Sequence, residues 1–210
     1  MMRILTSLSI IIICALTAVW GWEIAQFSRA RLAAGTAGPE ILRPWVGTPG
    51  LTGPTLENSL TMLAGSDTDA ELRRQSDELT ALLSVRPLSA GNWLALAALR
   101  LESAAPAEAV QGALTMSWLT GPNEGGLMWR RAVFGLLHWE TFPEEAHRGT
   151  IRDLAGAMLG GVATGDEVTT ASRLLDHKSR ETRTRITELL RASGLHDKEL
   201  ERLGLPSAGG

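Results

Sequence analysis

Residues 87–109 read PLSAGNWLALAALRLESAAPAEA. Residues 122–146, PNEGGLMWRRAVFGLLHWETFPEEA, have proline and tryptophan residues in the same order and at similar spacings. Each copy has an opening proline, a tryptophan in an apolar run and a second proline before an Ala- and Glu-rich helix start: Pro87, Trp93 and Pro106 in the first, Pro122, Trp129 and Pro143 in the second. The opening prolines are 35 positions apart. Because proline is tolerated in the first turn of a helix, each copy predicts two antiparallel helices. A period in the mid-thirties is typical of helical-pair repeats, which usually bind macromolecules.

The first copy also matches a known repeat at particular positions. The residues at the spacings of the Trp, Leu and small positions of that repeat are Trp93, Leu96, Ala97, Ala109 and Ala113. The copy therefore resembles a degenerate tetratricopeptide unit, with Arg100 where the motif usually has Tyr. The resemblance implies that Trp93 fills the space between two closely packed helices. The alternative is an irregular helical bundle in which the proline spacings coincide by chance.

Residues 4–22, ILTSLSIIIICALTAVWGW, form an uncharged N-terminal stretch. As a helix it is about 28 Å long, close to the roughly 30 Å bilayer core. Trp20 and Trp22 lie where interfacial aromatic residues are common. A cleaved secretory signal ending at Gly21 is the alternative, but the cleavage site is poor and the run is long. An uncleaved membrane anchor is favoured, with the body in the periplasm of a bacterium and residues 4–22 in the inner membrane.

The rest of the chain divides by composition. We predict an anchor segment over 1–33, a linker rich in Pro, Gly and Thr over 34–66, a helical-repeat domain over 67–204 and a flexible tail over 205–210. The linker has four prolines spaced five apart, a density that interrupts helices. Apolar periodicity predicts helices over 69–85, 90–103, 107–119, 124–140, 144–162, 166–178, 181–192 and 197–203, with a short helical turn over 56–63. No run predicts a strand, so the predicted fold is all-α.

Several patterns that could carry chemistry have simpler structural interpretations. Asp67-Thr68-Asp69 resembles a metal-binding triplet, but its place before a helix favours capping. The four histidines are not spaced as metal ligands and are expected at the surface or at the edge of the packed helices. Cys14 is the only cysteine, which excludes a disulfide within the chain. We therefore predict no catalytic residue, no cofactor and no metal site, and a protein that is not an enzyme.

Two further motifs concern packing and nucleic acid. Gly156, Gly160 and Gly161 are small residues that allow close helix packing, with self-association as the minority interpretation. Residues 186–203 superficially resemble a helix-turn-helix, but the second helix would carry three acidic residues that repel DNA. With a net charge of −3, the chain is not expected to bind nucleic acid.

The candidate partner-binding residues are Arg130 and Arg131. Adjacent cations cannot both face the core, so at least one guanidinium should reach solvent and pair with a partner carboxylate. The alternative is a salt bridge within the chain to Glu124 or Glu140.

The segments around Trp93 and Trp129 also resemble small single-anchor helical proteins that accompany exopolysaccharide or O-antigen genes in alphaproteobacteria. This resemblance implies an accessory role in envelope polysaccharide assembly or export, with a membrane or polysaccharide-assembly protein as partner. Two hypotheses from other classes remain. One is a glycan-binding module that uses exposed Trp45 or Trp139 for stacking. The other is a membrane-tethered DNA-binding regulator.

Overall fold

The computed structural model describes residues 2–37, 44, 48, 51 and 68–206 and is all-helical over them. Its elements are α1 (Met2–Ala37), α3 (Asp69–Val85), α4 (Ala90–Glu102), α5 (Ala107–Thr120), α6 (Gly125–Leu137), the 3₁₀ turn η2 (Trp139–Thr141), α7 (Glu144–Leu159), α8 (Gly165–Asp176), α9 (Arg180–Ala192) and α10 (Asp197–Arg202). The described residues contain no strand, which confirms the all-α prediction. The predicted turn over 56–63, Trp45 and most of the linker lie outside the described residues.

Two compact units make up the chain, residues 1–87 and residues 88–210. The first unit contains α1 and α3, so it includes a helix that the sequence interpretation placed in the helical-repeat domain. Helix α1 runs to Ala37, four residues into the predicted linker. In the part of the chain that the structure describes, no helix is both long and apolar enough to cross a membrane. Within the apolar stretch 4–22, side chains are described only for residues 13, 14 and 16–22.

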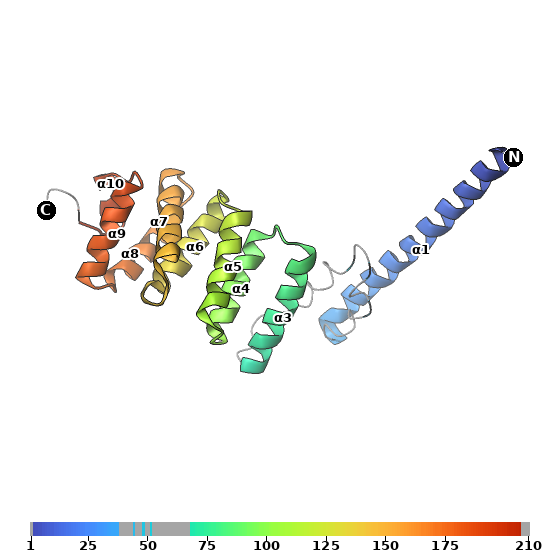
Figure 1. The fold of residues 1–210 in the computed structure, drawn as a ribbon, viewed down its shortest axis with the longest axis horizontal. Helices are drawn as coiled ribbons and strands as arrows, with labels where there is room; N and C mark the ends of the chain where they lie inside the picture. The colour runs from blue at the N-terminus through green and yellow to red at the C-terminus, as the bar shows by residue number, and fades with distance from the viewer. Residues whose placement is uncertain (1, 38–43, 45–47, 49–50, 52–67, 207–210) are drawn as a thin grey trace. The chain divides into compact units, whose positions relative to one another are not determined.

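The second unit is built from consecutive helices that pack against one another (Figure 1). The most extensive packing is between α4 and α5 and between α6 and α7, the two pairs expected from the repeated prolines and tryptophans. Helix α8 packs on α6, α9 packs on α7, and α10 returns against α8. These helix-pair contacts are compatible with a helical repeat.

Proline and capping side chains determine where several helices begin. Pro106 and Pro143 are the N-cap residues of α5 and α7. Thr164 and Glu167 form a capping box at the start of α8, in which each side chain accepts a hydrogen bond from the other residue's backbone N–H. Such boxes satisfy N–H groups that have no partner within the helix. The opening prolines of the two copies lie three positions before α4 and α6, outside the helices.

Two helices end three residues earlier than predicted. Helix α6 stops at Leu137, and the 3₁₀ turn that follows directs Trp139 into the core, where 3% of its surface is exposed. Helix α7 stops at Leu159 because Gly160 and Gly161 close it, Gly161 with φ of +64°. Glycine adopts this left-handed conformation without steric cost, so the glycine pair ends the helix instead of extending it to residue 162.

The core of the second unit is apolar and continues from the second helix pair to the chain end. Trp129, Leu136 and Leu154 represent the α6–α7 part of one cluster, which extends through α8 and α9 to Leu205. Trp93, by contrast, is only half-buried, although Leu96 and Ala97 beside it are fully buried. The role of Trp93 between its helices therefore stays a prediction, and its counterpart Trp129 is the more deeply buried of the two.

Candidate partner-binding surface

A charged side chain occupies the interior where the first helix pair meets the second. Arg131 on α6 is fully buried, and its Nε and Nη2 donate to the two carboxylate oxygens of Asp153 on α7 at 2.6 and 3.1 Å. Asp153 is also fully buried. A bidentate guanidinium–carboxylate pair is the geometry in which buried opposite charges best offset the loss of hydration.

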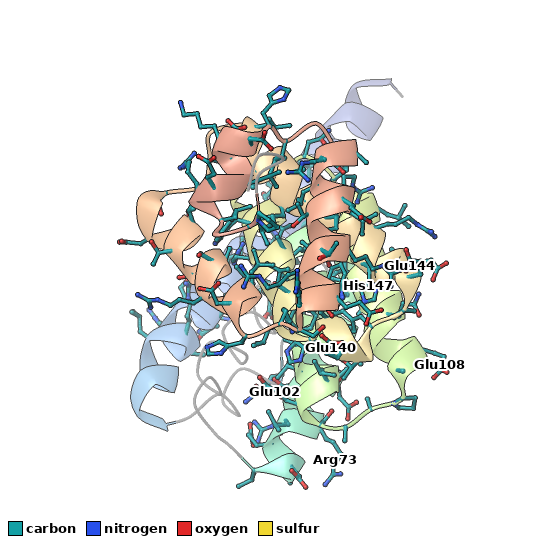
Figure 2. The ribbon with its side chains drawn as sticks, turned by 90° about the vertical axis from the view of Figure 1, so that its left-hand side faces the viewer. Arg73, Glu102, Glu108, Glu140, Glu144 and His147 are labelled. Carbon is teal, nitrogen blue, oxygen red and sulfur yellow. The ribbon has the colours of Figure 1, made fainter. Side chains whose placement is uncertain are left out.

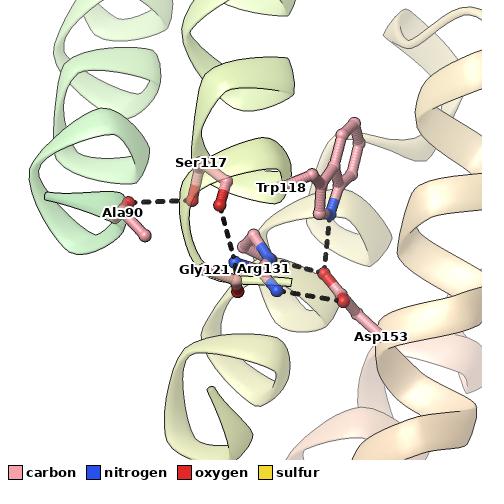
Figure 3. A network of polar contacts seen from close by, with 6 residues as sticks. All are labelled: Ala90, Ser117, Trp118, Gly121, Arg131 and Asp153. Atoms are coloured by element: carbon pink, nitrogen blue, oxygen red, sulfur yellow. Dashed lines mark hydrogen bonds and ion pairs between the residues drawn. The ribbon is translucent and has the colours of Figure 1, made fainter. Parts of the chain in front are cut away.

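Further hydrogen bonds connect this pair to helix α5 (Figure 3). Arg131 Nη1 donates to the carbonyls of Ser117 and Gly121 at 3.1 and 2.9 Å. The indole Nε1 of Trp118 donates to Asp153 at 2.7 Å. Ser117 extends the network through a hydrogen bond from its hydroxyl to the carbonyl of Ala90, at the start of α4. These hydrogen bonds, here called the junction network, therefore connect α4, α5, α6 and α7 and fix their positions relative to one another.

The junction network changes the interpretation of the two arginines. Arg131 cannot bind a partner because none of its side chain is exposed, and its internal partner is Asp153, neither Glu124 nor Glu140. Its buried position follows from helix geometry, since Arg131 shares a face of α6 with the buried Gly135. Arg130 is exposed, as expected for at least one of the two cations. Its role in binding remains a prediction.

An open apolar cleft lies in the same unit, away from the junction network's charges. Its volume is about 120 Å³. One wall is formed by four residues of α5 at i, i+3, i+4 and i+7, namely Ala107, Val110, Gln111 and Leu114. The other walls come from the end of α4, the α4–α5 loop, η2 and the start of α7, and they consist of Leu101, Ala105, Thr141, Phe142, Pro143 and Ala146. Pro143 and Ala146, at the start of α7, contribute only short side chains to the cleft.

Acidic residues adjoin this cleft on three different elements. Glu102 follows Leu101, Glu108 follows Ala107 and Glu140 precedes Thr141, and each of the three is exposed. None forms an ion pair within 4.0 Å among the residues that the structure describes. Figure 2 shows the three side chains in the lower half of the view, with Glu108 at its right-hand edge. We call these three carboxylates the acidic rim.

Neighbouring acids at the start of α7 differ from the rim because they are paired. Glu145 pairs with Arg148 at 3.1 Å, and Glu144 pairs with Arg185 of α9. Desolvation opposes ionisation of Glu144, but its hydrogen bonds and charge interactions with Arg185 and His147 hold the pKa of this carboxyl below its ordinary value. These two carboxylates are therefore already neutralised from within the chain.

His147 is more enclosed than predicted, whereas His138 is half-buried at the end of α6, as expected for an edge position. His147 is buried and stacks on Trp139, with ring centroids 4.0 Å apart, and its Nε2 lies 2.7 Å from the Trp139 carbonyl. Trp139 therefore cannot act as the exposed stacking platform for a glycan. Desolvation and the charge of Lys178 lower the pKa of His138, while the nearby Glu102 raises it in part. His177 and His196 are exposed, as expected.

The other sequence motifs considered for chemistry or packing lie on α3, α7, α9 and α10. Thr68, not an aspartate, is the N-cap of α3, and its hydroxyl accepts from Glu71 N–H. A side chain at Gly156 would collide with Met128 of α6, so this glycine permits close packing. The C-terminal α9 and α10 do form two helices around Ser193 and Gly194, with acidic residues on α10. Within the described residues, no group of His, Cys, Asp and Glu side chains is arranged to hold a metal ion.

No protein-family model, curated protein or solved structure matches this chain.

Proposed function

We propose that this protein is a non-catalytic, membrane-tethered interaction module, in which a tetratricopeptide-like helical domain presents a docking surface to a protein partner. The observation that carries the proposal is the open cleft with its unpaired acidic rim, set in a helical unit whose interior charges are already satisfied. Exposed apolar surface that is rimmed by polar residues is a common feature of protein–protein interaction sites.

The membrane part of the proposal rests on the N-terminal sequence. Residues 4–22 are uncharged and lie within α1. The apolar side chains described on this helix are largely exposed, among them Leu16 at 64% and Val19 at 62%. Apolar side chains exposed around a helix need a nonaqueous environment or a partner. An inner-membrane anchor with a periplasmic body is the arrangement that we propose.

An accessory role in envelope polysaccharide assembly or export is the cellular context that we propose. It is supported by the sequence resemblance around Trp93 and Trp129. The partner would be a membrane protein or a polysaccharide-assembly protein.

The function is tested by affinity capture of the full-length tagged chain from detergent-solubilised bacterial membranes. We expect a specific protein to co-purify, and we expect a chain with Arg173→Glu on α8 to capture it equally well, because this exposed residue adjoins neither the cleft nor the rim. Recovery of the chain without a partner would contradict the proposed role. Separately, intact-mass analysis should find residues 1–22 retained in the membrane pellet; a soluble chain that begins near Trp22 would contradict the anchor.

A further inference from the structure

We infer that the cleft binds one apolar side chain of a basic amphipathic segment in the partner, while lysines or arginines on either side of that side chain pair with the acidic rim. The inference rests on the proposed function and names the chemistry of the segment that docks.

The size of the cleft limits what enters it. A volume of about 120 Å³ is somewhat smaller than the roughly 150 Å³ apolar cavity that binds benzene in an engineered protein. One branched aliphatic side chain or one small aromatic ring therefore fills it. The floor, which includes Val110 and Leu114, is buried and apolar, so the occupant gains most from an apolar group.

The rim determines the charge of the flanking residues. Glu102, Glu108 and Glu140 come from α4, α5 and η2, and each is exposed and is the chain neighbour of a residue that lines the recess. Neither Arg148 nor Arg185 neutralises them, because these cations pair with Glu145 and Glu144. A partner cation would therefore meet unpaired carboxylates, which favours basic segments and disfavours acidic ones.

Two local features of the cleft work against the stability of the free chain. Glu102 is the last residue of α4, where the helix dipole disfavours a carboxylate. Ala104, in the loop that follows, has φ of +53°, in the left-handed region that non-glycine residues avoid. The next residue, Ala105, lines the cleft. Residues with strained backbone cluster at ligand-binding and switch regions.

The same charges disfavour two other occupants. An anionic lipid headgroup would be repelled by the rim. A second copy of the chain carries a net charge of −3 and would also be repelled on average. A basic segment of a different protein is the occupant that satisfies both the recess and the rim.

The test is site-specific photo-crosslinking in the full-length chain, in native membranes. Benzoylphenylalanine replaces Gln111, which lines the cleft and is half-buried, or Thr170 of α8, an exposed control position outside the cleft. We expect position 111 to crosslink to a segment in which lysines or arginines flank an apolar residue, identified by mass spectrometry. Position 170 should not crosslink to that segment.

The rim is tested in the same assay with two matched triple variants. Glu102→Gln/Glu108→Gln/Glu140→Gln should lower the crosslink yield at position 111 at least tenfold. The control Glu181→Gln/Glu188→Gln/Glu201→Gln removes three exposed acids from α9 and α10 and should leave the yield unchanged. Because screening weakens exposed ion pairs, raising the salt concentration should also lower the yield of the unchanged chain.

A crosslink from position 111 to lipid, to a second copy of the chain or to an acidic segment would overturn the inference. An unchanged crosslink yield in the triple rim variant would also overturn it. If affinity capture recovers a partner that position 111 does not contact, the proposed function stands and the docking surface lies elsewhere. If no partner is captured at all, the proposed function fails and this inference fails with it.

Discussion

The junction network and the cleft belong to the same helical unit, and they differ in how they hold charge. At the junction, Arg131 and Asp153 have no exposed surface, and the carboxylate is bound by both the guanidinium and Trp118. At the cleft, three carboxylates are exposed and form no ion pair with any residue that the structure describes. The buried, paired charges of Arg131 and Asp153 fix the relative positions of the helices. The exposed carboxylates of the acidic rim remain available to a partner. This difference predicts that substitutions at the junction unfold the protein, whereas substitutions at the rim affect only binding.

Removing one charge of the junction should have the largest effect. Asp153→Ala leaves the Arg131 guanidinium buried without its counter-charge, which typically costs about 3–5 kcal/mol. Urea unfolding followed by circular dichroism measures this loss. The double variant Arg131→Met/Asp153→Leu removes both charges, and we expect it to be much closer to the unchanged protein. Equal stability of the single variant and the unchanged protein would mean that the pair does not hold the junction.

The buried tryptophan of the second copy should matter more than its counterpart in the first. Trp129 is 5% exposed, and Trp129→Ala should cost about 3–5 kcal/mol as a large-to-small core substitution. Trp93 is half-buried, so Trp93→Ala should cost less. Matched denaturant titrations compare the two. The reverse order would show that the first helix pair, and not the second, contributes most to the packing around the junction.

A glycine contact tests how closely α6 and α7 approach. A Cβ at Gly135 would lie 1.9 Å from Thr150 Oγ1, so Gly135→Ala forces the helices apart at a cost of about 1–3 kcal/mol. Gly112 of α5 has open space around it, and Gly112→Ala should stabilise by about 0.5–1 kcal/mol through helix propensity. Thermal unfolding of both variants measures the difference. Stabilisation by both substitutions would contradict the close approach.

Neutralising the rim should barely change stability. Glu108→Gln and Glu140→Gln should each stay within about 0.5 kcal/mol, the usual range for exposed positions. Glu102→Gln should stabilise slightly, by about 0.3–1 kcal/mol, because it removes a negative charge from the C-terminal end of α4. Urea titration provides the measurement. A large loss of stability in any of the three would assign the rim a structural role and weaken the comparison with the junction.

The smallest expected effect is a pH dependence at His138. Its pKa is lowered in the folded protein, so the neutral ring is favoured there, and the stability from this group is fully present above about pH 6.5. That stability is lost as pH falls from the unfolded pKa through the folded pKa. His138→Asn should therefore lose less stability than the unchanged protein between pH 7.5 and 5.5. Because Glu102 raises this pKa, Glu102→Gln should lower it further, which NMR titration of the imidazole detects.

Local patterns predicted the helices well where proline and capping residues stop the chain. The helix predicted over 69–85 is observed with those bounds, and those that begin at Ala90 and Ala107 differ only by one residue at their ends. These features were predictable because a proline or a cap acts on its own neighbours. The early end of α6 was not predicted, because the turn at Trp139 depends on a contact with His147, eight residues later.

The candidate surface was predicted less well than the helices. Arg130 and Arg131 were treated as equivalent cations, yet one is exposed and the other is fully buried. A signal for the buried pair was present, since Asp153 lies three positions after Thr150 and four before Ala157, on a helix face that is otherwise uncharged. The cleft could not be predicted in this way, because its walls come from α4, α5, η2 and α7, and the periodic residues of α5 do not indicate which other segments face them.

By itself, the sequence determined the helical class and the pairing of α4 with α5 and of α6 with α7. Apolar periodicity and proline placement are local properties that the chain carries before it folds. Only the tertiary structure decided which arginine is buried, which tryptophan completes the core and where an apolar recess meets unpaired carboxylates. Those outcomes depend on which side chains from distant segments share one space, and burial and pairing are energies of that shared environment.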